Sequence, residues 1–226
     1  MFADLRRVKS VNKATVLQRA LATGIIPVIR AATAEDALFA AEAVLAGGVD
    51  VVEITMTVPG ATTVVSRIAE TMPQIVVGAG TVLNADAAQR CLDAGAQFLV
   101  SPGINLKTLE FAQRKSVLMI AGALTPTEVM SAWEFGADLV KIFPCSQVGG
   151  ASYIRALKGP FPEIPLVPTG GVNLETCAAF IEAGASALGV GGELILKEAI
   201  RQKNASLISG LACQMLHAVQ VARAKN

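Results

Sequence analysis

Two charged side chains interrupt otherwise apolar runs of this sequence. Lys141 lies in Asp138-Leu-Val-Lys-Ile-Phe-Pro144, and Glu53 lies in Val51-Val-Glu-Ile-Thr55. If the run around Lys141 is a buried strand, its ammonium group loses hydration, which favours the neutral amine, a nucleophile towards ketones. Burial of Glu53 would favour its protonated form and suit it to proton transfer. The two residues together would supply an amine nucleophile and an acid/base group.

Each of these residues also has an ordinary structural interpretation. Lys141 could extend to solvent or pair with Asp138 at a strand edge. Glu53 could be a solvated residue at a strand end, or simply the ion partner of Lys141. A buried lysine and a buried carboxylate near the mouth of one barrel indicate a catalytic pair much more specifically than either residue does alone. The rest of the sequence favours this catalytic interpretation.

The elements that must position the two residues alternate between β-branched runs and alanine-rich runs, a pattern that predicts strands followed by helices. Strands are expected at 25–29, 51–55, 75–79, 98–101, 117–121, 139–142, 166–168 and 187–190. A leading helix is expected at 12–23, and further helices at 34–46, 62–71, 85–94, 106–115, 126–135, 151–157, 174–183 and 206–224.

Eight strand–helix units predict an α/β protein that folds as a (β/α)8 TIM barrel with an extra N-terminal helix. The predicted strands are continuous apolar runs, as in parallel sheets that are covered on both faces. No linker or shift in composition divides residues 1–226, so a single domain is expected. A doubly wound open sheet is the competing architecture, but eight regular units at this length favour the barrel.

Composition and charge narrow the functional classes. The chain has 226 residues, of which 53% are hydrophobic, and a formal net charge of +1, so no nucleic-acid partner is indicated. Residues 1–13 lack the apolar core of a signal peptide, and no later apolar run reaches the roughly 18 residues of a membrane helix, so we expect a cytoplasmic protein without a membrane partner. The cysteines are widely separated and His217 is the only histidine, which argues against metal, redox and Ser-His-Asp sites.

In barrels of this kind, the carboxyl ends of the strands carry the chemistry. Arg30 follows the first predicted strand, Thr81 the third and Pro102 the fourth. Lys141 and Glu53 fall within the sixth and second strands, so all five side chains are expected at the same end of the barrel.

Two glycine pairs follow the seventh and eighth predicted strands. Thr169 precedes Gly170 and Gly171 in the first loop, and Gly191 and Gly192 form the second. Glycine lets an anion approach backbone N–H groups, and a short helix start adds a favourable dipole, so these loops predict a phosphate site.

Six motifs resemble, in order, those of one family. They are Glu53-Ile-Thr-Met-Thr57, Gly78-Ala-Gly-Thr-Val82, Ser101-Pro-Gly103, Lys141-Ile-Phe-Pro144, Lys158-Gly-Pro-Phe161 and Pro168-Thr-Gly-Gly-Val172. The sequence from about residue 25 to residue 196 thereby resembles the class I aldolases of the 2-dehydro-3-deoxy-6-phosphogluconate (KDPG) and 4-hydroxy-2-oxoglutarate (KHG) family.

The resemblance implies a trimeric barrel that cleaves a 2-keto-3-deoxy acid to pyruvate and an aldehyde such as glyceraldehyde 3-phosphate, in the Entner–Doudoroff pathway. It implies that Lys141 forms a Schiff base with the substrate ketone and that Glu53 acts as the acid/base through a water. Thr81 and Pro102 match positions that line the pyruvyl pocket, and Phe143 matches one beside the Schiff base. The implied reaction needs no metal and no other cofactor.

The sequence departs from the family pattern at two positions. Some members carry an arginine where this chain has Thr57, and that arginine binds the substrate carboxylate. Arg30, at the end of the neighbouring predicted strand, could supply the guanidinium instead, although an interhelical ion pair is its ordinary interpretation. Some members also carry a serine in the phosphate loop where Gly192 stands, so that here only backbone donors remain.

Two other functional classes fit parts of the pattern. A phosphosugar isomerase or epimerase on the same barrel would use Glu53 as a base and Lys141 only as an electrophile. A non-catalytic sugar-phosphate binding protein would bind without turnover, but an unused buried ion pair costs stability. Trapping of a covalent pyruvate adduct by borohydride separates the aldolase from both.

Overall fold

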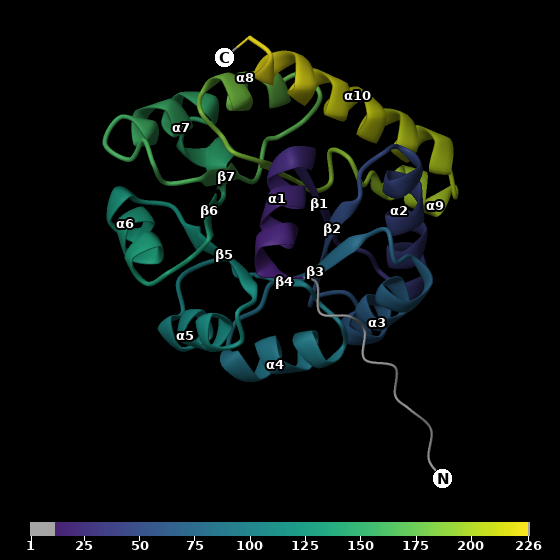
Figure 1. Cartoon of the computed structure of the whole chain (residues 1–226). Helices are drawn as coiled ribbons and strands as arrows, with labels where there is room; N and C mark the ends of the chain where they lie inside the picture. The colour runs from purple at the N-terminus through teal and green to yellow at the C-terminus, as the bar shows by residue number, and fades with distance from the viewer. Residues whose placement is uncertain (1–11, 226) are drawn as a thin grey trace.

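The computed structural model describes residues 12–225, and eight parallel strands form their centre. The strands pair in the order β7-β6-β5-β4-β3-β2-β1-β8, and a bridge between Thr169 and Gly189 brings the two outer strands together. Helices surround this ring of strands (Figure 1). The predicted (β/α)8 barrel is confirmed, whereas the expected absence of a signal peptide at residues 1–13 lies almost wholly outside the described residues.

The bounds of the predicted elements agree with the observed ones to within three residues, and several match at both ends. The strands are β1 (Ile25–Ile29), β2 (Val51–Thr55), β3 (Val76–Gly80), β4 (Phe98–Val100), β5 (Leu118–Ala123), β6 (Leu139–Ile142), β7 (Leu166–Pro168) and β8 (Leu188–Val190). The helices are α1 (Lys13–Thr23), α2 (Ala34–Ala46), α3 (Ala61–Thr71), α4 (Ala85–Asp93), α5 (Leu106–Arg114), α6 (Pro126–Glu134), α7 (Ala151–Lys158), α8 (Cys177–Glu182), α9 (Lys197–Arg201) and α10 (Ala205–Arg223). The sequence prediction missed α9 and a 3-10 turn, η1 (Cys145–Val148).

The strands divide their side chains between two apolar cores. Val51 and Leu139 belong to a cluster inside the barrel, whereas Val52 belongs to the larger cluster that lies under the surrounding helices. Successive side chains of a strand point to opposite faces. Glu53, two residues after Val51, and Lys141, two residues after Leu139, therefore face the barrel interior.

Helix α1 closes the end of the barrel at which the strands begin. Val16 and Ala20 are buried and belong to the interior cluster, and Arg19 forms an ion pair of 2.6 Å with Asp50, the residue before β2. Gly24 ends the helix in the left-handed conformation, with a φ of 71°, so that β1 can start at once. Figure 1 shows α1 in the middle of the ring of strands. The extra N-terminal helix predicted from the sequence thus seals one end of the interior.

Helix α10 corrects one sequence-based expectation. Its 19 residues are long and apolar enough, by length and composition alone, to cross a membrane, although no such run was expected. The helix packs along α2 and α8, and Figure 1 shows it lying against the outside of the barrel. Its buried residues recur every three or four positions, the spacing of a helix that packs one face on a core: Ile208, Ala212, Met215, Val219 and Ala222.

Candidate active site

Lys141 and Glu53 meet inside the barrel. Lys141 Nζ lies 3.7 Å from Glu53 Oε2, and the two residues are only 7% and 2% exposed. Lys141 does not pair with Asp138, because Asp138 forms an ion pair of 2.7 Å with Lys13 and accepts a hydrogen bond from the backbone N–H of Met119. The structure therefore brings together the two residues that the sequence singled out, and excludes the solvent-exposed interpretation of each.

Glycines in neighbouring strands make room for the carboxylate. Glu53 pairs in register with Val28 of β1 and Gly78 of β3, and the side chain reaches towards Gly80, two residues further along β3. A Cβ atom on Gly80 would collide with the Glu53 carboxylate. The glycine therefore permits the observed position of this side chain.

The amine and the carboxylate are not locked to each other. Their separation of 3.7 Å exceeds the length of a normal hydrogen bond, and Glu53 Oε1 is buried without a hydrogen-bond partner among residues 12–225. The ring of Phe143 flanks the amine, with its centroid 5.5 Å from Lys141 Nζ. Unused hydrogen-bonding capacity on both groups suits a pair that must exchange protons with a bound molecule.

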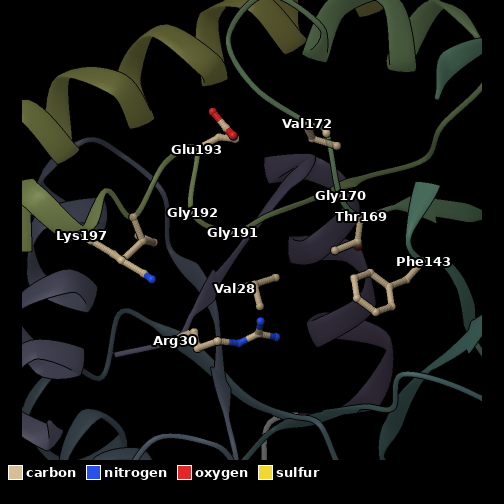
Figure 2. A pocket seen from close by; sticks show the side chains of 12 residues that line it. Val28, Arg30, Phe143, Thr169, Gly170, Val172, Gly191, Gly192, Glu193 and Lys197 are labelled. Atoms are coloured by element: carbon tan, nitrogen blue, oxygen red, sulfur yellow. The ribbon is translucent and has the colours of Figure 1, made fainter. Parts of the chain in front are cut away.

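A cavity of about 390 Å³ reaches the ring of Phe143, which flanks the amine, and collects seven of the predicted site residues (Figure 2). Lys141 and Glu53 do not themselves line this cavity. These seven are Arg30, Phe143, Thr169, Gly170, Gly171, Gly191 and Gly192. Five residues that were not predicted complete the lining: Val28, Val172, Glu193, Ile195 and Lys197. The loops after β7 and β8 therefore face the same space as the end of β1.

Free backbone donors line one side of this cavity. Gly170 and Gly171 both have positive φ angles, 94° and 75°, which a residue with a side chain rarely adopts. Within the described part of the chain, the N–H groups of Gly170, Gly171 and Gly192 donate no hydrogen bond. Adjacent N–H groups without internal acceptors form a concavity suited to an anion.

The helix contribution expected at this anion site is not present. Helix α8 begins only at Cys177, after a turn in which the Asn173 side chain accepts hydrogen bonds from the N–H groups of Glu175 and Thr176. The loop after β8 continues as turns as far as Lys197, the first residue of α9. Helix α8 therefore begins three residues later than predicted, beyond the residues that form the loop, because side-chain and turn hydrogen bonds occupy its expected first turn.

A second cavity, of about 290 Å³, also has Phe143 in its lining. Pro102 and Gly122 line it, and a Cβ on Gly122 would collide with the carbonyl of Pro102. Glu128 also lines this cavity, but its carboxylate accepts hydrogen bonds from the N–H groups of Leu124 and Thr125, which lower the pKa of that carboxyl. Glu128 is therefore committed to capping α6.

Thr57 and Thr81 line neither of these two cavities. The Thr57 hydroxyl lies 2.7 Å from that of Thr55, which in turn donates to the carbonyl of Ile29 at the end of β1. Thr81 follows β3 directly and has a φ of 59°, a strained conformation for a β-branched residue. Both threonines stand at the carboxyl ends of strands next to Glu53, but the structure does not bring them into the cavity that holds Arg30.

Arg30 is exposed and forms no ion pair within residues 12–225, so the interhelical pairing considered for it does not occur there. Figure 2 shows its guanidinium extended into the cavity, towards Val28 and Phe143. A guanidinium in this position is available for a carboxylate on a bound molecule.

Lys197 is the cation of this cavity that the sequence prediction missed. It lies beyond the glycine pair of the last loop, in the run Gly191-Gly-Glu-Leu-Ile-Leu-Lys197. A cation shortly after a glycine loop is a signal that could have identified it. The buried thiol of Cys145, after Phe143 and Pro144, has no comparable role, because burial raises its pKa to about 11.

A parallel barrel that holds an amine and a carboxylate near the carboxyl ends of its strands has the arrangement expected of an enzyme that works through a lysine. The family described as KDPG and KHG aldolase matches residues 16–211, and the chain belongs to this family.

Named relatives cover nearly the whole of the matched chain. The chain is 34% identical to the 2-dehydro-3-deoxy-phosphogluconate aldolase of Treponema pallidum, over 87% of this chain and 94% of that protein. It is 34% identical to the KHG/KDPG aldolase of Escherichia coli K12, over 89% and 95%. The crystal structure of the KDPG aldolase from Legionella pneumophila, with pyruvate captured as a covalent carbinolamine intermediate, has a TM-score of 0.80 and 32% identity, and covers 91% of this chain and 98% of that one.

Gly80→Ala tests how closely the strand geometry controls Glu53. The added Cβ should displace the carboxylate. With Glu53 as the acid/base that the family resemblance implies, turnover should fall towards the roughly 10² to 10⁴-fold loss that follows removal of such a group. Steady-state kinetics and a melting curve would be measured on the same preparations. Gly210→Ala is the matched control, because it adds a Cβ in open space; equal rates for the two variants would contradict the steric role of Gly80.

Proposed function

We propose that this chain is a class I aldolase that cleaves 2-dehydro-3-deoxy-6-phosphogluconate, or a related 2-keto-3-deoxy acid, to pyruvate and an aldehyde. The observation that carries the proposal is the buried pair of Lys141 and Glu53, 3.7 Å apart, in a barrel that belongs to the KDPG and KHG aldolase family. 4-Hydroxy-2-oxoglutarate (KHG) is included among these substrates because the E. coli relative is named for both KHG and KDPG.

In the first step, the amine of Lys141 attacks the substrate ketone at C2. The resulting carbinolamine loses water and becomes an iminium ion, which places a positive charge next to the bond that must break. The carbinolamine named for the Legionella protein is the same kind of intermediate.

In the second step, Glu53 accepts the proton of the C4 hydroxyl, directly or through a water. The C3–C4 bond breaks, its electron pair moves to the iminium nitrogen, and an enamine of pyruvate and a free aldehyde result. Protonation of the enamine at C3 and addition of water at C2 then release pyruvate and restore the amine. The free lone pairs of Glu53 Oε1 support this assignment.

We assign the remaining residues by their place around this pair. Thr81, Pro102 and Phe143 would line the pyruvyl portion, and Arg30 would bind its carboxylate in place of the arginine missing at Thr57. The backbone of the loops at 169–171 and 191–192 would bind the far end of the substrate, which is supported by the N–H groups that donate no bond within residues 12–225.

Lys141→Met tests the covalent route. Methionine has similar bulk but no amine, so turnover should disappear while the protein still folds. Borohydride reduction in the presence of pyruvate, followed by mass spectrometry, should give a stable adduct on the native protein and none on the variant. Lys107→Met, which removes an exposed lysine, is the control; an unmodified native protein would point to an isomerase or a binding protein instead.

Glu53→Gln separates proton transfer from adduct formation. The variant should still form the reduced pyruvate adduct, but cleavage should slow by roughly 10² to 10⁴-fold because the proton acceptor is lost. Adduct yield and the rate of pyruvate release would be compared with those of Glu70→Gln, an exposed control. An undiminished rate would remove Glu53 from the mechanism.

Arg30→Lys tests the carboxylate assignment. A lysine replaces the bidentate fork by a point charge, so KM should rise for every 2-keto acid, whether or not the substrate carries phosphate. Thr57→Arg in the same background should recover part of the loss, because β1 and β2 are neighbours. Kinetics in the condensation direction give the KM for pyruvate directly, and the exposed Arg155→Lys is the control. An unchanged KM for pyruvate in Arg30→Lys, with a normal KM in the control, would refute the assignment.

We also propose a homotrimer that works in the cytoplasm, in the Entner–Doudoroff pathway. Large apolar side chains are exposed on and after α6, with Met130, Trp133 and Phe135 exposed by 46%, 41% and 46%, which supports burial against another copy. Light scattering should give three times the chain mass, and Trp133→Glu should lower it. A native protein with the mass of one chain would contradict the trimer, and cell fractionation would check the location.

A further inference from the structure

The cavity that Phe143 lines holds two cations, which come from different elements and point to different parts of it. Arg30 follows β1, and Figure 2 shows its guanidinium directed towards Phe143, the neighbour of Lys141. Lys197 lies on the other side of Val28, near the loop of Gly191 and Gly192, with its amine turned into the cavity. The two cations are therefore placed to act on different ends of one bound molecule.

Lys197 is not neutralised by a carboxylate. Glu193 lines the same cavity, but its carboxylate points away from it in Figure 2. On the outer side, Lys197 borders an adjoining cavity with Asp36 and Arg201, and the nearby carboxylates there are already paired, Asp36 with Lys203 at 2.6 Å and Glu198 with Arg201 at 2.5 Å. Among residues 12–225, Lys197 takes part in no ion pair.

The glycine loops opposite Lys197 supply dipoles but no charge. Gly170, Gly171 and Gly192 offer backbone N–H groups, but Gly192 carries no hydroxyl. The helices that follow the two loops are short, with six residues in α8 and five in α9, so neither adds a strong dipole. A phosphate monoester near neutral pH carries a charge of nearly −2, and charge-assisted hydrogen bonds are the stronger ones. The cavity therefore needs a cation if it is to hold such a group firmly.

We infer that Lys197 binds the terminal phosphate of the substrate and so sets the preference of this enzyme for phosphorylated aldehydes. The inference rests on the proposed aldolase function and adds a specificity-determining residue to it. Arg30 would hold the carboxylate at the pyruvyl end, and Lys197 would hold the anion at the other end, so that the substrate lies between two cations with its ketone at Lys141.

The test compares two aldehydes that differ only in the phosphate. Condensation of pyruvate with glyceraldehyde 3-phosphate and with glyceraldehyde would be measured for the native protein and for Lys197→Met. The ratio of kcat/KM for the phosphorylated over the unphosphorylated aldehyde should fall roughly 10- to 100-fold, through KM, as expected for the loss of one charge-assisted contact. Lys197→Arg should keep most of the ratio.

Arg201→Met is the matched control for electrostatic steering. It removes a positive charge from the same short helix, but Arg201 is paired with Glu198 and lines only the adjoining cavity. Its ratio should equal that of the native protein. Inorganic phosphate gives a second readout, because its inhibition constant against glyceraldehyde 3-phosphate should rise in Lys197→Met and stay unchanged in Arg201→Met.

An unchanged ratio in Lys197→Met, or an equal fall of the ratio in Lys197→Met and Arg201→Met, would refute the role of Lys197. The borohydride adduct on Lys141 would still support the aldolase function in that case. A fall in kcat for both aldehydes would mean a structural role instead. Failure of the native protein to condense either aldehyde would overturn the proposed function, and this inference with it.

Discussion

The constraint on which the rest of the structure depends is that an amine and a carboxylate share the apolar interior of a barrel. Removing two charges from water costs several kcal/mol for each ion, and mutual attraction at 3.7 Å offsets only part of that cost. The strand register must also hold, because a slip of one residue would turn Lys141 out of the interior and into the layer beneath the helices. The two apolar cores, one on each side of the strands, offset the cost of burying the pair and hold the strand register.

Glycines in the strands shape the same site from the backbone. Gly80 leaves room for Glu53, Gly122 for the carbonyl of Pro102, and Gly189 for the side chain of Thr169. Each of these glycines lies in a strand next to the group that it accommodates. The positions of functional groups in this barrel are thus set as much by missing Cβ atoms as by contacts.

The strands were predictable because they are continuous apolar runs rich in β-branched residues, and most helices because the runs between them are rich in alanine. The burial of Glu53 and Lys141 was predicted from their place within apolar runs, and the loop position of Gly170 and Gly171 from their place after a strand. Helix α9 was missed because five residues show no period, and Lys197 was missed with it. The start of α8 was placed too early because the side chain of Asn173 forms a turn where the composition suggested a helix.

The closure of the barrel by α1 has a kinetic consequence. Val16 and Ala20 fill the end at which the strands begin, so molecules reach Lys141 only from the opposite end. In the proposed reaction the pyruvyl portion is bound covalently to Lys141 and the aldehyde portion lies towards the opening, so the aldehyde stands between pyruvate and solvent. Product release is then sequential, with the aldehyde leaving first, and in the reverse direction pyruvate must enter before its partner.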